Sequence, residues 1–104
     1  MASVKLVEYN GECASLLAAR LQDAIAEGTV GLIVDLGEHA LDSVLLHLVV
    51  VTDKTLNARG GRAIVLCDEA GQTALRATGL DMRLPVARSL SDALQLATAY
   101  LRRG

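Results

Sequence analysis

The sequence predicts an α/β fold in which about four mostly parallel strands alternate with four helices. Short apolar runs of strand length alternate along the chain with longer segments of helical spacing. Strands that alternate with helices in this way are joined by right-handed crossovers into a mostly parallel sheet. The chain has 104 residues and no repeat or linker, so we expect residues 1–104 to form a single domain.

The first half of the chain is expected to supply two strands and two helices. Residues 4–9 are short and mixed, as is typical of an edge strand, and residues 13–27 place apolar side chains at helical spacing. Residues 31–36 are almost continuously apolar, which predicts a strand covered on both faces. A second helix should begin at Asp42 or Ser43 and end near residue 58, before a glycine pair.

The second half repeats this alternation. Residues 63–67 are the next buried strand, and a helix from Asp68 or Glu69 to about residue 78 follows. Residues 84–86 form a short strand, which its proline should confine to an edge or a strand start. Ser89-Leu90-Ser91-Asp92 has the spacing of a capping box, and opens a last helix that runs to about residue 101.

The composition excludes several classes of function. The formal net charge is −2 and the chain has two Tyr but no Phe or Trp, so neither an electrostatic attraction to nucleic acid nor a base-stacking platform is expected. The N-terminus lacks the apolar region of a signal peptide, and no segment is long enough to insert into a membrane. Cys13 and Cys67 are expected to be buried or half-buried free thiols. We therefore expect a cytoplasmic protein.

The order of motifs resembles a STAS domain, the fold of bacterial anti-sigma factor antagonists. The resemblance covers roughly residues 31–101, and each motif alone is weak. Its carriers are Leu32-Ile33-Val34-Asp35-Leu36, Leu41-Asp42-Ser43, Ala58-Arg59-Gly60-Gly61-Arg62, Thr78-Gly79-Leu80, Leu84-Pro85-Val86 and Ser89-Leu90-Ser91-Asp92-Ala93-Leu94.

The resemblance implies a regulatory, non-enzymatic function. In that family a serine at the loop–helix junction is phosphorylated by an anti-sigma factor that is also a serine kinase, and only the unphosphorylated form binds this partner. By position, Asp42 corresponds to the family's acidic residue and Ser43 to the phosphoacceptor. No cofactor and no metal are implied, and a homodimer stays open.

Two departures separate this chain from the family pattern. The family commonly continues Asp-Ser-Ser-Gly, whereas Val44 and Leu45 follow Ser43 here, as in the stressosome-type scaffold branch. The family's Gly-Glu-x-Asp motif has Ala14 in place of its last acid, which lies near the phosphorylation site in the family. From the residues alone, Ser43 could equally be a helix N-cap without a regulatory role, as could Asp42.

The second predicted helix carries more apolar side chains than one core-facing stripe needs. In one phasing the core face is Leu45, Leu48, Val49, Thr52 and Leu56. Val44, His47 and Val51 then lie off that face, next to Asp42 and Ser43. These five residues, Asp42, Ser43, Val44, His47 and Val51, are the predicted partner-binding surface.

Three functions stay open at this point. The first is the anti-sigma factor antagonist described above, or a scaffold domain that is not phosphorylated. The second is a STAS subunit of a lipid-transport ABC complex, which would dock the same helix on the ATPase. The third is a small enzyme of flavodoxin-like layout that uses Cys67, although no glycine-rich phosphate loop follows a strand.

Overall fold

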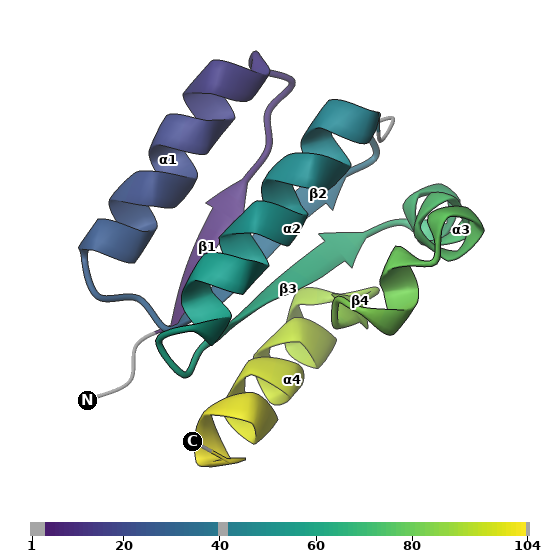
Figure 1. Cartoon of the computed structure of the whole chain (residues 1–104). Coiled ribbons are helices and arrows are strands. Elements are labelled where there is room, and N and C mark those ends of the chain that lie inside the picture. Colours follow the sequence, from purple (N-terminus) through teal and green to yellow (C-terminus); the bar gives the residue numbers. More distant parts are fainter. Residues whose placement is uncertain (1–3, 40–41, 104) are drawn as a thin grey trace.

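The computed structural model describes residues 4–39 and 42–103, and within them four helices alternate with four strands (Figure 1). A short 3-10 helix that the sequence did not predict, η1, precedes the last strand. The elements are β1 (Val4–Glu8), α1 (Ala14–Ala26), β2 (Gly31–Gly37), α2 (Ser43–Asn57), β3 (Arg62–Cys67), α3 (Glu69–Thr78), η1 (Leu80–Met82), β4 (Val86–Ala87) and α4 (Leu90–Arg103).

The four strands form one parallel sheet in the order β1-β2-β3-β4. Its register aligns a row of valines across the sheet, because Val7 lies opposite Val34, Val34 opposite Val65, and Val65 opposite Val86. β1 and β4 are the two edges. The sequence predicted an edge for the first strand, and an edge or a strand start for the proline of the last. The predicted α/β class, with parallel strands alternating with helices, is therefore confirmed.

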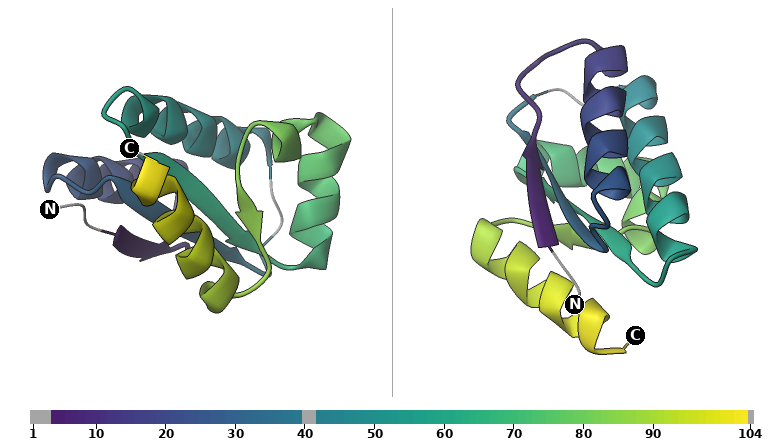
Figure 2. Two further views of the ribbon diagram at one scale, coloured as in Figure 1. Left: turned by 90° about the horizontal axis from the view of Figure 1, so that it is seen from below. Right: turned by 90° about the vertical axis from the view of Figure 1, so that its left-hand side faces the viewer.

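The sheet is covered on both faces, but by different numbers of helices (Figure 2). Alternate residues of β2 and β3 pack against α1, α2 and α3 on one face, in the larger core cluster. The residues between them, Ile33, Ile64 and Leu66, pack with Ala87 and with Ala93 and Ala97 of α4 on the other face. The near-continuous apolar character of these two strands follows from burial on both faces.

Two expectations about individual residues are corrected. The last strand comprises Val86 and Ala87 instead of residues 84–86, because the Leu84 N–H donates a hydrogen bond to the carbonyl of Leu80, the first residue of η1. Cys13, expected to be buried or half-buried, is exposed, since it lies at the N-cap of α1 outside the core. Cys67 is buried, as expected.

Candidate functional site

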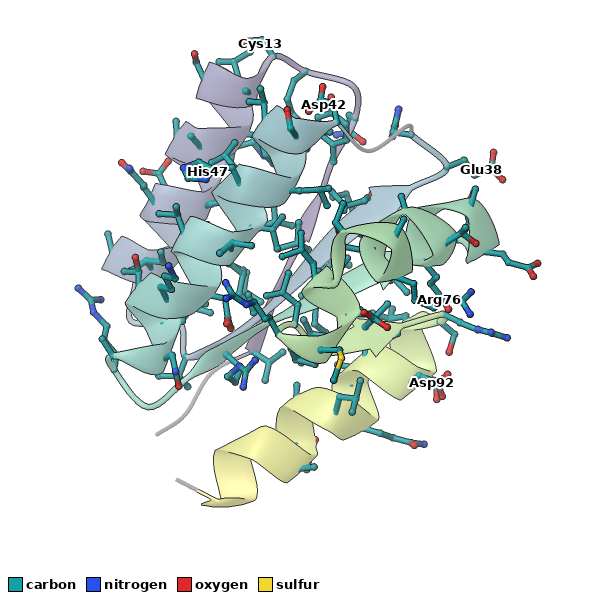
Figure 3. The ribbon with its side chains drawn as sticks, turned by 45° about the vertical axis from the view of Figure 1, so that its right-hand side comes forward. Cys13, Glu38, Asp42, His47, Arg76 and Asp92 are labelled. Carbon is teal, nitrogen blue, oxygen red and sulfur yellow. The ribbon has the colours of Figure 1, made fainter. Side chains whose placement is uncertain are left out.

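The predicted site lies where the N-termini of α1 and α2 come together, beyond the carboxyl ends of β1 and β2. The two helices run side by side, and Cys13 and Asp42 mark their neighbouring ends in Figure 3. This arrangement follows from the topology, because each helix starts directly after a parallel strand has ended at the same edge of the sheet. The edge therefore collects the β1–α1 loop, the β2–α2 loop and the first turn of α2.

Asp42 and Ser43 have different roles at the start of α2. The Asp42 carboxylate accepts a hydrogen bond of 2.8 Å from the Leu45 backbone N–H, which makes Asp42 the N-cap. Ser43 is the first helical residue and is exposed, so capping does not occupy its hydroxyl. Leu41, the first residue of the Leu41-Asp42-Ser43 motif, lies outside the described residues.

The predicted surface of α2 is exposed to solvent. Val44 and Val51 keep 55% and 45% of their surface accessible, and His47 is exposed between them. The phasing was wrong at one position: Leu48, expected in the core, is half-buried. Leu46 and Asp53 are buried in addition to the predicted core, because α2 packs against β3 as well as α1.

A hollow of about 360 Å³ lies beside Val51, between α1 and α2. Ile25 from α1 and Leu48 and Val51 from α2 give it an apolar lining. Arg59 closes one end, where its Nη1 donates a hydrogen bond of 3.2 Å to the Ile25 carbonyl. The sequence did not predict this hollow, since Leu48 was assigned to the core. It extends the apolar stripe of Val44 and Val51 toward α1.

His39, in the loop before α2, is held by the neighbouring loop. Its ring meets the Tyr9 ring edge-on, with centroids 4.9 Å apart and an interplanar angle of 70°. Gly11 leaves room for the ring, because a Cβ at Gly11 would lie 3.4 Å from the His39 Cε1. This contact joins the two loops that border Ser43. Sequence reasoning missed it, since Tyr9 was assigned to the end of a strand.

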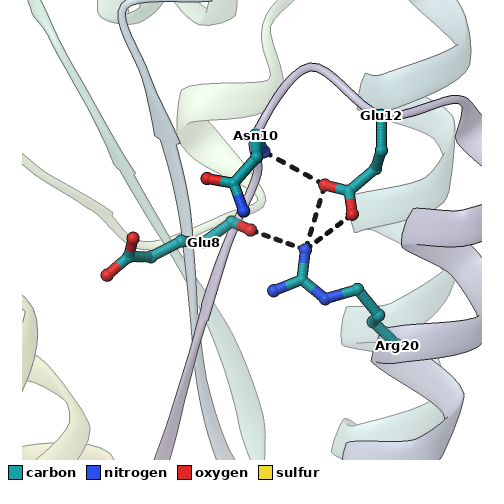
Figure 4. Close-up of polar contacts among 4 residues, drawn as sticks. All are labelled: Glu8, Asn10, Glu12 and Arg20. Atoms are coloured by element: carbon teal, nitrogen blue, oxygen red, sulfur yellow. Dashed lines mark hydrogen bonds and ion pairs between the residues drawn. The ribbon is translucent and has the colours of Figure 1, made fainter.

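The β1–α1 loop is also fixed by a cluster of polar contacts (Figure 4). The Glu12 carboxylate accepts a 3.0 Å hydrogen bond from the Asn10 N–H and both of its oxygens accept from Arg20 Nη1, at 2.9 and 2.8 Å. Arg20 also donates to the Glu8 carbonyl, at 2.7 Å. The Asn10 N–H, and after it Arg20, lower the pKa of Glu12 against the opposing effect of desolvation. Glu12 is therefore committed to holding its loop.

Cys67, the residue on which an enzymatic function would depend, lies at the carboxyl end of β3 and is buried. Burial, and then the carboxylates of Asp68 and Asp35, raise the pKa of the Cys67 thiol from 9.0 to about 11, so the thiolate is scarce at neutral pH. Among the described residues, no group of His, Cys, Asp and Glu is placed to hold a metal ion. At the start of α2, the exposed hydroxyl of Ser43 lies beside an apolar helix face.

Comparisons with known proteins identify two solved structures that are similar to this chain. The chain is similar to the crystal structure of an anti-sigma factor antagonist from Mycobacterium paratuberculosis, with a TM-score of 0.78 and 27% identity over 91% of this chain and 86% of that chain. It also shares the fold of the protein TM1081, solved by NMR, with a TM-score of 0.77 and 21% identity over 97% of this chain and 83% of that chain. No family model and no curated protein sequence matches.

The predicted resemblance to the STAS-type anti-sigma factor antagonists is therefore confirmed at the level of the fold. The four-stranded parallel sheet and its helices belong to a chain whose overall fold matches the mycobacterial antagonist over 91% of this chain. Within the described part of the chain, no helix is both long and apolar enough to span a membrane.

Proposed function

We propose that this chain is a non-enzymatic regulatory domain, an anti-sigma factor antagonist that binds an anti-sigma factor in the cytoplasm. The observation that carries the proposal is the exposed Ser43 hydroxyl at the start of α2, next to the apolar stripe of Val44 and Val51. The similarity to a solved anti-sigma factor antagonist supports the same class of partner. The partner is an anti-sigma factor with serine kinase activity, or a related regulatory protein.

The proposed switch is phosphorylation of Ser43. A phosphate there would add a charge of about −1.5 to −2 at a helix N-terminus, where the helix dipole tolerates it. The fold would stay intact because Asp42, and not Ser43, caps the helix. The added charge lies about 12 Å along the helix from Val51 and directly beside Val44, so it would act on a partner that covers both ends of the stripe. Phosphorylation would release the partner without reshaping the domain.

The partner is proposed to contact five residues of this chain. Asp42 and Ser43 form the polar end of the surface, Val44 and Val51 form its apolar part, and His47 lies between the two valines. An apolar stripe bordered by a modifiable hydroxyl is suited to a reversible protein interface. A phosphate on that hydroxyl would make the binding free energy of a partner on the stripe less favourable.

Capture of binding partners from a lysate of the source organism tests this function. Wild-type bait is compared with Ser43→Asp, Ser43→Ala and Val51→Asp, and the matched control is Leu94→Asp, which places the same charge on α4 at a residue exposed to the same degree. We expect a kinase-like anti-sigma factor on wild-type, Ser43→Ala and Leu94→Asp baits, and its loss from the other two. ATPase subunits of a transport complex on the wild-type bait would instead identify a transporter subunit.

The kinase step is tested separately with the captured partner and ATP. Mass spectrometry should locate one phosphate on Ser43, and Ser43→Ala should take up none. A partner that binds through Val51 but leaves Ser43 unmodified would make this chain a scaffold domain instead of a phosphorylation switch.

A further inference from the structure

The edge strand β4 leaves one row of its backbone groups unpaired with the sheet. Val65 lies opposite Val86, and its N–H donates a hydrogen bond of 2.9 Å to the Pro85 carbonyl. In a parallel ladder, successive residues of a strand direct their peptide groups to opposite sides. The Pro85 carbonyl points to β3, so the N–H and C=O of Val86 point away from the sheet. β4 lies at the opposite edge of the sheet from β1 (Figure 1).

Two hollows that both include Val86 lie along this edge, one toward α3 and one toward α4. The hollow toward α3 has a volume of about 210 Å³ and is bordered by Gln72 and Arg76 of α3 and by Asp81. The hollow toward α4 measures about 440 Å³, and Asp92, Gln95 and Leu96 form its α4 side.

The two hollows correspond to the two faces of the sheet, and they share Gln72 and Arg88 as well as Val86. Val86 packs on the α3 side and Ala87 on the α4 side. A strand added beside β4 would therefore direct alternate side chains into the two hollows.

Two guanidinium groups, those of Arg76 and Arg88, border the α3 hollow, and in the part of the chain that the structure describes neither forms an ion pair with a carboxylate. Arg88 Nε donates a hydrogen bond of 3.1 Å to Gln72 Oε1, and this leaves the terminal nitrogens of Arg88 available. Arg76 points out from α3 near the same place (Figure 3). Asp81 and Asp92 lie on the borders of the hollows, but among the described residues neither forms an ion pair with these arginines. A carboxylate that entered between the guanidiniums would gain charge-assisted hydrogen bonds.

The geometry points to a second binding surface: the β4 edge takes up an extended peptide whose alternate side chains are acidic. The peptide pairs with the outward N–H and C=O of Val86, its carboxylates enter the hollow of Arg76 and Arg88, and its intervening side chains cover Leu96. This is the strand-addition form of peptide recognition. Since β4 has two residues, few main-chain hydrogen bonds are available, and the arginines supply most of the selectivity. The inference does not depend on the proposed function of the partner-binding residues at the start and along the exposed face of α2.

The peptide acetyl-Glu-Val-Glu-Val-Glu-amide is the probe, titrated into the 15N-labelled full chain and followed by amide chemical shifts. We expect saturable shifts that centre on Gln72, Arg76, Val86 and Arg88, with a dissociation constant on the order of 100 µM. A peptide with Lys in place of each Glu should bind at least about tenfold more weakly. Equal binding of the two peptides, shifts centred on the other edge at Val4–Glu8, or no shifts at about 1 mM peptide would overturn the proposal.

Changes to the protein and to the peptide backbone test the two parts of the proposal separately. Arg76→Gln should weaken binding about fivefold or more, whereas Arg83→Gln, an exposed arginine that borders neither hollow, should leave binding unchanged. N-methylation of the Glu amides and N-methylation of the Val amides block opposite edges of the peptide, so one should abolish binding and the other should preserve it. Similar affinities for both methylated peptides, or displacement of the probe by an equal concentration of inorganic phosphate, would contradict strand addition.

Discussion

The carboxylate of Asp53, in the C-terminal half of α2, accepts a hydrogen bond of 2.9 Å from the Ala63 backbone N–H near the start of β3. The same oxygen accepts a second hydrogen bond, of 3.0 Å, from Arg62 Nε. Asp53 is only 8% exposed, and a buried carboxylate without hydrogen-bond partners would destabilise the fold. The two donors compensate for the burial of this charge. Arg62 in turn donates to the Arg83 carbonyl at 2.6 Å, which connects α2 to the segment that precedes β4.

Replacement of Asp53 by Ala should lower the free energy of unfolding by about 3 kcal/mol, because the Ala63 N–H and Arg62 both lose a buried acceptor. Asp53→Asn keeps a carbonyl oxygen as acceptor and should cost about half as much. Urea unfolding followed by circular dichroism measures both. Glu27→Gln is the control, since the exposed Lys5–Glu27 ion pair should contribute less than about 1 kcal/mol. An Asp53→Ala protein as stable as that control would show that the buried contact is dispensable.

Asp42 and Ser43 are predicted to differ in their contribution to stability. Asp42→Ala removes the side chain that accepts the Leu45 N–H, and should lower the free energy of unfolding by about 1 kcal/mol. Ser43→Ala removes an exposed hydroxyl and should change it by less than about 0.5 kcal/mol. Thermal unfolding of both variants measures the difference. The reverse order of effects would make Ser43 the cap and remove the argument that its hydroxyl is available for modification.

The sequence was sufficient to predict the order of the strands and α-helices, though not η1, because burial on both faces leaves a continuous apolar signature in β2 and β3. It was less successful at β4, where Pro85 marked the neighbourhood of an edge strand but not its residues. The contact of Leu84 with η1 decides that boundary, and this contact joins segments without any periodic pattern. At Leu48 the predicted phasing gave a core position, but in the structure Leu48 borders the hollow between α1 and α2 and is half-buried.

The candidate site was predicted only in part. The exposure of Val44, His47 and Val51 follows from helix phasing, which a sequence displays. The Tyr9–His39 contact depends on how two loops approach each other, and the hollow beside Leu48 depends on how α1 packs against α2. No local sequence pattern encodes these tertiary arrangements. The partner-binding role of these residues stays a prediction.

Gly61 should tolerate no side chain. A Cβ at this position would lie 2.0 Å from the Val30 carbonyl oxygen, and the nearest atoms are all backbone, so side-chain movement cannot relieve the contact. Gly61→Ala should therefore lower the free energy of unfolding by about 2–4 kcal/mol. Gly60→Ala is the matched control: Gly60 has a φ of +82° but open space around it, so only about 1 kcal/mol is expected. Urea midpoints that coincide for the two variants would contradict the close approach of Val30.

The two cysteines should react with iodoacetamide at very different rates. At pH 8 the exposed Cys13 should be alkylated within minutes, whereas Cys67 is buried and has its pKa raised to about 11, so it should react only when the chain unfolds. Mass spectrometry of native and urea-unfolded samples distinguishes one label from two. Rapid double labelling of the folded chain would show that the carboxyl end of β3 is open to solvent.

The raised pKa of Cys67 also fixes the sign of a pH effect on stability. Between pH 9.0 and about 11 the unfolded chain releases the thiol proton while the folded chain retains it. The unfolded state then binds fewer protons, so the free energy of unfolding falls as the pH rises through this range. Cys67→Ala removes the titrating group, and its stability should fall less steeply than that of the wild type when both are unfolded in urea at pH 8, 9, 10 and 11. Parallel pH profiles would mean that Cys67 titrates normally in the folded protein, and that the buried thiol is better solvated than its position at the end of β3 indicates.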